Sequence, residues 1–248
     1  MSETILEVKE LRKEFDKKRH FFSMKKETFP AVDGVSFEIK KGECVGLIGE
    51  SGSGKSTTAY MTAGLLKPDR GEIIFHGAYM QMIFQDPVKA LNPRKKILDC
   101  ILEGLIYRRK DLTKEEKRRM AYEAMDVVRL DRSYGERYSR ELSGGECQRA
   151  TIARAILDHP ELLICDEVTS ALDVSVQAQI IRLLDRLKRE MGHSYLFICH
   201  DISLVDGFCD RVIVMRNGKI VEAGETAEVL GNPKEDYTKM LMDSVLKL

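Results

Sequence analysis

The chain has 248 residues, 43% of them hydrophobic, and its 40 lysines and arginines balance its 40 aspartates and glutamates. This length and composition suit one large domain or two small ones, and the zero net charge argues against a nucleic-acid partner, because nucleic-acid-binding domains are usually basic. No apolar run is long enough to cross a bilayer and the polar start at residues 1–4 lacks a signal-peptide core, so we expect the protein to stay in the cytoplasm.

Three strands are predicted before the first glycine-rich loop. They cover residues 5–11, 31–39 and 44–48, and the last is a continuous apolar run typical of a buried strand. A basic segment with two phenylalanines, residues 17–26, separates the first two strands. We interpret it as a solvated hairpin tip; the alternative, a nucleic-acid patch, is disfavoured by the zero net charge.

A glycine-rich loop follows the third strand and precedes a short helix predicted at residues 57–63. Its pattern is G-x-x-x-x-G-K-[ST], in which glycines turn backbone N–H groups toward a polyphosphate and the helix N-terminus adds partial positive charge. Lys55 is predicted to reach the terminal phosphates, and the Ser56 hydroxyl to bind Mg²⁺. The alternative is a simple glycine-rich turn, which the strand–loop–helix context disfavours. The residues predicted to bind nucleotide here are Gly49, Glu50, Ser51, Gly52, Ser53, Gly54, Lys55, Ser56 and Thr57.

Downstream of this loop, strands give way to helices. Short strands are predicted at residues 72–75 and 80–84. Across residues 93–140, apolar residues recur at helical spacing among many charges, and no strand pattern interrupts them. We therefore predict a helical subdomain there, inserted into one α/β domain whose nucleotide-binding core comprises residues 1–92 and 141–248.

The rest of the core returns to alternating strands and helices. Strands are predicted at residues 162–165, 194–199 and 211–215, with helices at 174–191 and, packed onto the domain, at 237–248. Such alternation predicts an α/β fold with a mostly parallel sheet, which binds its ligand at the carboxyl ends of the strands.

Polar residues directly follow several of these strands. Asp166 is suited to hold Mg²⁺, and Glu167 is suited to polarise a water molecule against the γ-phosphate. His200 can hydrogen-bond a γ-phosphate oxygen, and Gln85 can contact both Mg²⁺ and the attacking water. Taken singly, the carboxylates fit a solvated turn, the histidine a structural role and the glutamine a turn. Their common position at strand ends favours catalysis by Glu167, His200 and Gln85.

Residues 142–146 have the sequence LSGGE and open a predicted helix. Ser143 is a suitable N-cap, and Glu146 stands three residues later as in a capping box, so capping alone explains the motif. The alternative is a second phosphate-binding surface formed by Ser143, Gly144 and Gly145. Because the chain already has one phosphate loop, that surface would serve a nucleotide held by another subunit.

The order of these motifs resembles the nucleotide-binding subunit of an ATP-binding cassette (ABC) transporter over nearly the whole chain. The motifs are residues 49–56, Gln85, 142–146 with Gln148-Arg149, 164–167, 170–173 and His200. The resemblance implies a P-loop NTPase core with a mostly parallel sheet, an antiparallel β edge subdomain and an inserted helical subdomain. It also implies ATP and Mg²⁺ as cofactors, with Ser56, Gln85 and Asp166 at the metal.

The resemblance further implies a head-to-tail dimer of two ATPase subunits with two ATPs between them. Residues 143–145 would contact the γ-phosphate held by the opposite subunit, residues 170–173 would communicate across the interface, and Phe15 would stack on adenine. The implied partners are two transmembrane permease subunits, met through Gln85 and the helical block after it, and indirectly an extracytoplasmic solute-binding protein. The implied location is the cytoplasmic face of the cell membrane.

Further segments are similar to importers of peptides and nickel, which commonly pair two different ATPase subunits; this chain resembles the second of the two. These segments are residues 84–87, 91–94, 168–179, 232–233 and 237–239. The chain stops at Leu248 without the cysteine-bearing tail of many peptide-importer ATPases, which favours nickel or another small solute over peptides. We predict an ATPase that energises import of peptides or nickel.

The chain departs from the family pattern at three other places. The loop between residues 77 and 80 is much shorter than usual, so the edge subdomain should be trimmed. Val168 replaces a usual proline, which should loosen the turn after Glu167. Cys147 stands where glutamine is commoner, a small change beside the interface.

Two other functions are compatible with parts of the sequence. A non-transport ABC-type ATPase in a soluble enzyme assembly, similar to the carbon–phosphorus lyase, would carry the same motifs. A small-molecule kinase shares only the phosphate loop and leaves residues 143–146 and His200 unexplained.

The cysteines do not indicate a metal or iron–sulfur site. Six are scattered along the chain without a C-x-x-C pair. Cys44, Cys165 and Cys199 lie in apolar runs, so we expect them to be buried, reduced and structural.

Overall fold

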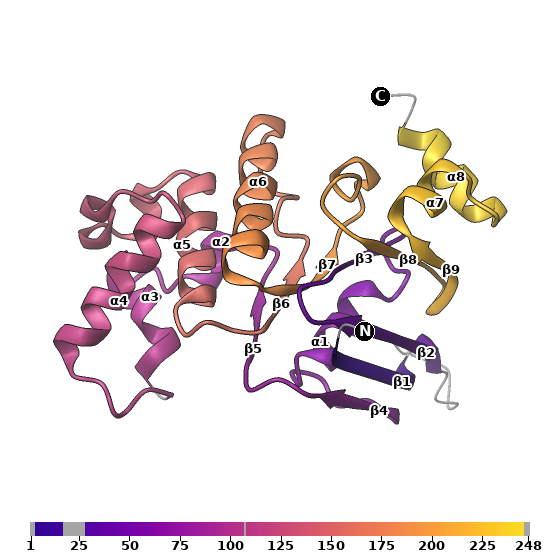
Figure 1. Cartoon of the computed structure of the whole chain (residues 1–248), viewed down its shortest axis with the longest axis horizontal. Helices are drawn as coiled ribbons and strands as arrows, with labels where there is room; N and C mark the ends of the chain where they lie inside the picture. Colours follow the sequence, from indigo (N-terminus) through magenta and orange to yellow (C-terminus); the bar gives the residue numbers. More distant parts are fainter. Residues whose placement is uncertain (1–2, 17–27, 107, 246–248) are drawn as a thin grey trace, which may run out of the picture. The chain divides into compact units, whose positions relative to one another are not determined.

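The computed structural model describes residues 3–16, 28–106 and 108–245. It divides into two compact units, whose elements Figure 1 labels. The first unit combines Met1–Gly77 with Ser194–Leu248, and the second unit is the chain between them.

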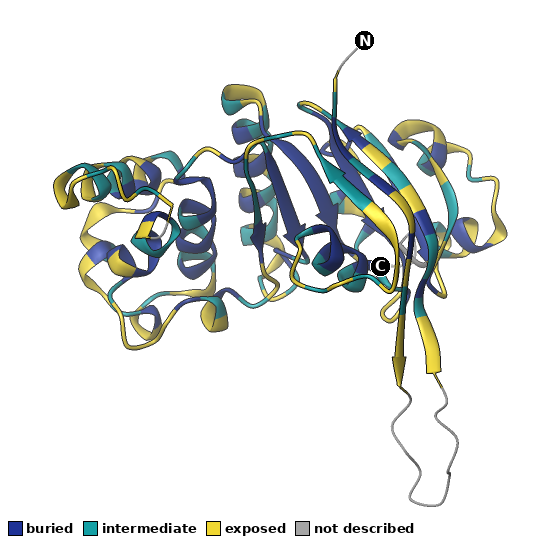
Figure 2. Ribbon diagram, turned by 90° about the horizontal axis from the view of Figure 1, so that it is seen from below, coloured by how far each residue is buried: buried dark blue, intermediate teal, exposed yellow. Residues whose placement is uncertain are grey.

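The first unit contains a four-stranded arrangement centred on β3 (Cys44–Ile48). β7 (Ser194–Ile198) and β8 (Arg211–Arg216) lie on either side of β3 and run parallel to it, and β9 (Lys219–Glu225) is antiparallel to β8. Every residue of β3 and β7 is buried, and such strands are among the dark-blue parts of the ribbon in Figure 2. Their continuous apolar sequences fit strands that are covered on both faces.

The parallel pairing fixes which loops meet at one edge of this sheet. Leu47 lies opposite Ile198 of β7 and Ile213 of β8. β3 and β7 run in the same direction. The loop that begins at Gly49 after β3 and the segment that reaches His200 after β7 therefore leave the sheet at the same edge.

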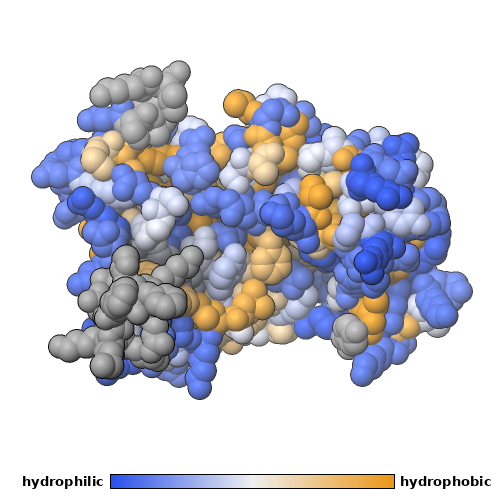
Figure 3. All heavy atoms as spheres, turned by 180° about the vertical axis from the view of Figure 1, so that it is seen from behind, coloured by the Kyte–Doolittle hydropathy of each residue, from blue (hydrophilic) through white to orange (hydrophobic). Residues whose placement is uncertain are grey.

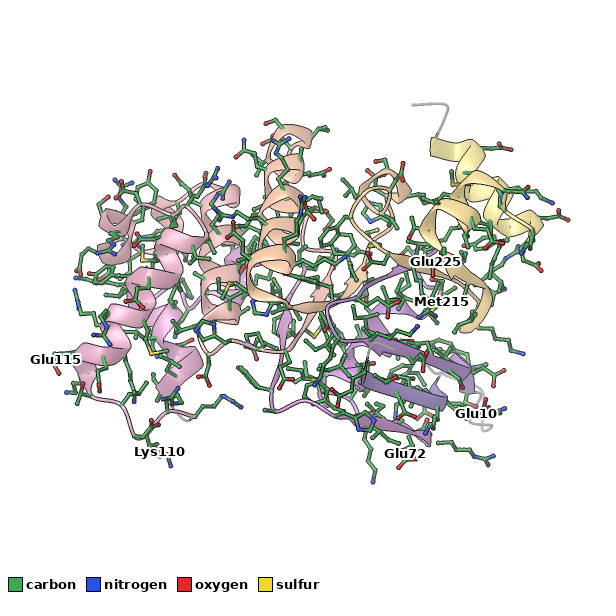
Figure 4. The ribbon with its side chains drawn as sticks, viewed as in Figure 1. Glu10, Glu72, Lys110, Glu115, Met215 and Glu225 are labelled. Atoms are coloured by element: carbon green, nitrogen blue, oxygen red, sulfur yellow. The ribbon has the colours of Figure 1, made fainter. Side chains whose placement is uncertain are left out.

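A second sheet of the first unit is antiparallel, with strand order β2–β1–β4. β1 spans Thr4–Asp16, β2 spans Thr28–Lys40 and β4 spans Arg70–Phe75. Glu10 and Glu72, labelled in Figure 4, belong to its paired strands β1 and β4. In the first part of β1, buried apolar residues are interspersed with exposed charged ones, as expected for a sheet with one covered face.

Helices complete the first unit. α1 (Lys55–Thr62) follows the glycine-rich loop and packs against β1, β2 and β7. α7 (Thr226–Gly231) packs on β8 and β9, while α8 (Asp236–Val245) contacts the 3-10 helix Ile202–Leu204.

The second unit is mainly helical around one pair of parallel strands, β5 (Met80–Ile83) and β6 (Leu162–Asp166). Its helices are α2 (Pro87–Ala90), α3 (Ile97–Ile106), α4 (Lys114–Val127), α5 (Gly144–Ile156) and α6 (Val174–Met191), with 3-10 helices at Arg132–Glu136 and Ser139–Glu141. Among them, α5 packs against α2, α3 and α4.

The ends of α6 have clear local causes. Asp173 accepts a hydrogen bond from the Val176 backbone N–H at 3.0 Å, which caps the first turn. Gly192 follows the last turn with φ +71°, a left-handed conformation that glycine adopts without steric cost. Between them, Leu184 and Leu187 are among the buried residues of an amphipathic helix.

The surface of the described chain is mostly polar. On the face seen in Figure 3, hydrophobic residues form several small separate patches among hydrophilic ones, which is usual for folded proteins. Among the described residues, no helix has the length and apolar character needed to span a membrane.

Most predicted elements are confirmed, with shifted ends. The α/β fold with a mostly parallel sheet and an antiparallel sheet is confirmed, and the block at 93–140 is helical as predicted. Its status as a separate inserted subdomain stays a prediction, and it lies wholly within the second unit. The basic segment 17–26 lies outside the described residues, as do residues 246–248 at the end of the predicted last helix.

Candidate active site

The glycine-rich loop lies in the first unit between β3 and α1. Gly49, Gly52 and Gly54 have φ values of +145°, +81° and +106°. A Cβ atom at Gly49 would lie 2.2 Å from the carbonyl oxygen of Met215, the β8 residue labelled in Figure 4, and one at Gly54 would lie 2.4 Å from that of Ala31. Neither position can accept a side chain, so the loop is held close against β8 and β2.

Polar groups of this loop suit a polyphosphate. The ammonium of Lys55, which is almost fully buried, donates to the carbonyls of Gly49 (2.7 Å) and Glu50 (2.9 Å), so it lies over the loop. The Ser53 hydroxyl is buried with no hydrogen-bond partner among the described residues. The Glu50 N–H donates to the Tyr237 hydroxyl at 3.1 Å, so α8 braces the loop. A buried cation, an unsatisfied hydroxyl and a helix N-terminus together form an anion-binding loop.

The other predicted nucleotide contacts of the first unit are accessible. Ser56 and Thr57, in the first turn of α1, are half-buried, and Glu50 and Ser51 are exposed. His200, directly after β7, is exposed and follows the same sheet edge as the loop. Its role toward the γ-phosphate stays a prediction.

Phe15 lies near the end of β1 with its ring partly exposed. It pairs with Phe29 across the sheet, with ring centroids 6.1 Å apart. The ammonium of Lys13 lies 5.9 Å from the Phe15 ring centroid and is held by Asp69 at 2.8 Å. An exposed ring fixed by a neighbouring ring suits stacking on a flat base, and adenine stacking stays a prediction.

In the second unit the structure brings Gln85 and Glu167 together. The Gln85 side-chain amide donates to Glu167 Oε2 at 2.8 Å and to the Ser170 hydroxyl at 3.4 Å. The two residues follow β5 and β6, which pair in parallel, so both leave the sheet at its carboxyl edge. The sequence placed both residues at strand ends but did not predict this hydrogen bond, because the pairing of β5 with β6 is a long-range contact.

Glu167 is held in an uncommon conformation. Its φ is +47°, in the left-handed region, and for a residue other than glycine this costs on the order of 1–3 kcal/mol. The Ser170 N–H and hydroxyl both donate to the Glu167 carbonyl, at 3.1 and 3.0 Å, and close the turn. Val168, the residue in place of the family's proline, is buried inside this turn. Strain of this kind concentrates at functional sites.

The predicted metal ligands come from both units. Asp166 ends β6 with only 1% of its surface exposed, and Gln85 is exposed, whereas Ser56 belongs to α1 of the first unit. In the described part of the chain, no cluster of three histidine, cysteine, aspartate or glutamate side chains could hold a metal by itself. A hydroxyl and a carboxylate nevertheless suit Mg²⁺, which commonly retains waters and takes substrate phosphate oxygens as its other ligands.

The segment at residues 143–146 forms the predicted capping box of α5. The Ser143 hydroxyl accepts from the Glu146 N–H at 3.3 Å, and Glu146 Oε2 accepts from the Ser143 N–H at 2.7 Å. Hydrogen bonding by the Ser143 N–H lowers the pKa of Glu146 below its usual value. Capping therefore accounts for the motif locally, and the phosphate-binding role of Ser143, Gly144 and Gly145 stays a prediction.

The two glycines of this segment allow a close helix contact. A Cβ at Gly145 would lie 2.8 Å from Cγ1 of Val176 in α6, and one at Gly144 would lie 3.4 Å from Leu172. The start of α5 therefore lies against the start of α6. The neighbouring Cys147 is fully buried, and burial raises the pKa of its thiol to about 11.

The loop at residues 169–173 is held by Gln177, whose role could not be predicted from the sequence. The Gln177 side-chain amide donates to the carbonyls of Thr169 (3.1 Å) and Leu172 (3.0 Å). The only available signal was its place in the segment 168–179, which carried a family resemblance without a physical role.

The chain is similar to known proteins in both sequence and structure. The family model described as "ABC transporter" matches residues 32–170. The chain is 42% identical to an oligopeptide transport ATP-binding protein of Bacillus subtilis, over 99% of this chain and 83% of that protein, and 43% identical to one of Salmonella typhimurium, over 97% and 77%. It also resembles the dimeric post-hydrolysis structure of an ATP-binding cassette bound to ADP and phosphate, with a TM-score of 0.78, 27% identity and coverage of 90% and 99%.

Proposed function

The chain belongs to the ABC transporter family, and from that membership we propose that it is the ATP-hydrolysing subunit that drives peptide import through a membrane permease. The observation that carries the proposal is the 42% identity, over 99% of the chain, to an oligopeptide transport ATP-binding protein. Neither relative reported above is named for nickel, so peptides replace nickel as the favoured solute, contrary to the inference from the end of the chain.

ATP binding rests on the first unit. The loop N–H groups and Lys55 bind the phosphates, Phe15 stacks on the adenine, and the positive end of α1 adds to the attraction. Ser56, Gln85 and Asp166 are the proposed Mg²⁺ ligands. When bound, Mg²⁺ neutralises phosphate charge and orients the terminal phosphate.

Hydrolysis is assigned to Glu167, Gln85 and His200. Glu167 takes a proton from the attacking water, whose oxygen forms the bond to the γ-phosphorus as the bond to the leaving ADP breaks. The Gln85 amide holds one carboxylate oxygen of Glu167 and so orients the base. The His200 imidazole donates a hydrogen bond to a γ-phosphate oxygen.

The proposed working form contains a second ATPase subunit and two permease subunits. Support comes from the resemblance to a dimeric cassette and from the exposed Ser143 and Gly144 at the start of α5, which are available to another subunit. We further propose an association with the cytoplasmic face of the membrane and an indirect dependence on a solute-binding protein.

Glu167→Gln tests the assigned base in the complex reconstituted with its permease. We expect ATP binding to persist and turnover to fall by about 100-fold or more, because a general base contributes roughly 10²–10⁴ in rate. The exposed Glu190→Gln on α6 is the matched control and should retain turnover. ATPase activity near the normal level in the Glu167 variant would remove that residue from the role.

The solute is tested in the same complex. Oligopeptide presented with the solute-binding protein should stimulate ATP hydrolysis, whereas Ni²⁺ should not. Stimulation by Ni²⁺ alone would overturn the choice of peptide while leaving the ATPase assignment intact. Purification of the chain with a soluble enzyme assembly and no permease would favour the non-transport alternative.

A further inference from the structure

Four arginines line one hollow of about 320 Å³ in the second unit. They come from the end of α4, from α5 and from α6, and Figure 1 shows α5 and α6 side by side. The lining contains no carboxylate, although the whole chain has as many acidic as basic residues. The lining residues are Arg129, Arg149, Gln179, Arg182, Leu183 and Arg186.

Two of these arginines have a structural role at the C-terminus of α4. Arg149 donates to the Val128 carbonyl at 2.8 Å, and Arg186 donates to the Val127 carbonyl. Arg149 also donates to the side-chain oxygen of Gln179 at 3.1 Å. Cations at a helix C-terminus satisfy its last carbonyls and its partial negative charge, so packing alone explains this pair.

The other two arginines have no such explanation. Within the described residues, the side chains of Arg129 and Arg182 make no hydrogen bond or ion pair, and both residues are exposed. Arg129 occupies the position after α4 where helices usually place glycine: its φ is +55°, its N–H donates to Asp126 (3.0 Å), and the Leu130 N–H donates to Met125 (2.9 Å). An arginine in this left-handed conformation costs conformational energy, and its only evident contribution is the positive charge that it adds to the hollow.

Across the residues that the structure describes, little of the positive charge in this hollow is compensated. Burial, and then the charges of Arg129 and Arg186, lower the pKa of Arg149. Among the described residues, the only ion pair made by these four arginines joins Arg186 Nε to the exposed Glu190, at 4.0 Å. Like charges held together by structural contacts attract an anion, and guanidinium groups match phosphate oxygens with paired N–H donors.

We propose that this hollow binds a small anion with several negative charges, of the polyphosphate type. Arg149 and Arg186 are fixed by their carbonyl contacts and form the preorganised part of the site, while Arg129 and Arg182 complete it. A bound anion would connect α5 with α6, the helices that start at the capping box and at Asp173. The site is separate from the glycine-rich loop, which lies in the first unit.

The test measures binding of inorganic tripolyphosphate by calorimetry at low salt. The full chain carries Lys55→Ala throughout, so that the glycine-rich loop contributes little. The test protein adds Arg129→Gly and Arg182→Gln, and the control adds Arg189→Gln, an exposed α6 arginine outside the lining. We expect affinity to fall at least about tenfold in the test protein, because charge-assisted hydrogen bonds are lost, and to change less than about twofold in the control.

A stability measurement separates loss of binding from loss of fold. Arg129→Gly removes the strain of a left-handed arginine. Without anion, the melting temperature of this variant should therefore be unchanged or raised by up to about 4 °C. Tripolyphosphate should raise the melting temperature of the Lys55→Ala protein but much less that of the test protein. Repeating the titration with ATP distinguishes a nucleoside polyphosphate from an inorganic one as the source of the phosphates.

Two results would overturn the proposal. One is equal tripolyphosphate affinity in the test and control proteins. The other is binding of an acidic peptide such as polyglutamate at this hollow without measurable tripolyphosphate binding, which would make it a protein-docking surface.

Discussion

Glycine at two positions of the loop after β3 is required by neighbouring carbonyl oxygens. The spacing of glycines, lysine and serine, together with the strand before it and the helix after it, predicted the loop. The sequence did not reveal that Ala31 and Met215 supply the carbonyls against which the loop packs, because those residues lie on other strands. The phosphate site is thus predictable from local residues, whereas its rigidity depends on tertiary contacts.

Gly54→Ala tests this close packing. The new methyl group would lie 2.4 Å from the Ala31 carbonyl oxygen, and the alanine would be held in a left-handed backbone conformation. We therefore expect a loss of about 2–5 kcal/mol in stability, together with weaker ATP binding. Gly42→Ala is the matched control, because Gly42 has φ +74° but no atom within 4 Å of the added Cβ. Urea unfolding should show a loss of only about 1–2 kcal/mol there; equal losses in both variants would contradict the packing argument.

His193 predicts a pH dependence of stability. Burial holds the pKa of His193 below its usual 6.5, and its Nδ1 lies 2.6 Å from the Pro160 carbonyl oxygen. As the pH falls below about 6.5, His193 therefore takes up a proton more readily in the unfolded chain than in the folded chain. Its contribution to stability is present above pH 6.5 and is lost as the pH falls toward the folded pKa.

The measurement is the urea midpoint at pH 7.5 and at pH 5.5. The wild-type midpoint should be lower at pH 5.5 than at pH 7.5, and His193→Gln should make this difference smaller. His159→Asn, at an exposed position with φ +48°, is the control. Its midpoint should drop almost as far as that of the wild type, because burial outweighs the electrostatic effect of His159 in lowering the pKa of His193. An unchanged pH dependence in the His193 variant would assign the effect to other groups.

Among the elements, length and patterning decided what could be predicted. The helix at Val174–Met191 was placed correctly because its apolar stripe, its aspartate cap and its terminal glycine agree. β9 and α7 were missed: β9 is an edge strand with no fully buried residue, and α7 has six residues, so neither has a clear period. β1 continues to Asp16, beyond the predicted end at residue 11, because its pairing with β2 continues after its residues cease to be buried.

The contact between α5 and α6 gives a prediction for a pair of residues. Gly145→Ala places a methyl group 2.8 Å from Val176, whose branched side chain has little rotamer freedom in a helix, so we expect a loss of about 1–3 kcal/mol. Val176→Ala should remove the clash, so the double variant should lose less stability than the sum of the losses in the two single variants. Additive losses in urea unfolding would show that the two helices do not meet there.

At the scale of the whole chain, the sequence predicted a helical block inside an α/β domain. The two compact units of the structure are divided after Gly77 and after His193, so the second unit includes β5, β6 and the helices around them, while the inserted subdomain at 93–140 stays a prediction. A sequence pattern reveals elements, but the grouping of elements depends on which of them touch. Predicted site residues accordingly fall into both units, with Lys55 and His200 in the first and Gln85 and Glu167 in the second.

The six cysteines, all buried, are distributed equally between the units. The first unit holds Cys44, Cys199 and Cys209, and the second holds Cys100, Cys147 and Cys165. A buried thiol reacts with a maleimide only when its surroundings open, so the labelling rate of each cysteine, followed by mass spectrometry, reports the opening of its own unit.

Nucleotide should therefore protect the two sets of thiols unequally. If the first unit opens independently, ADP at 100 times its Kd should slow labelling of Cys44, Cys199 and Cys209 by about 100-fold and leave the other three nearly unchanged. Equal protection of all six would mean that the units open as one cooperative body. Labelling of the first set at an unaltered rate would contradict nucleotide binding at the glycine-rich loop. The native thiols thus report cooperativity between the two halves without any engineered label.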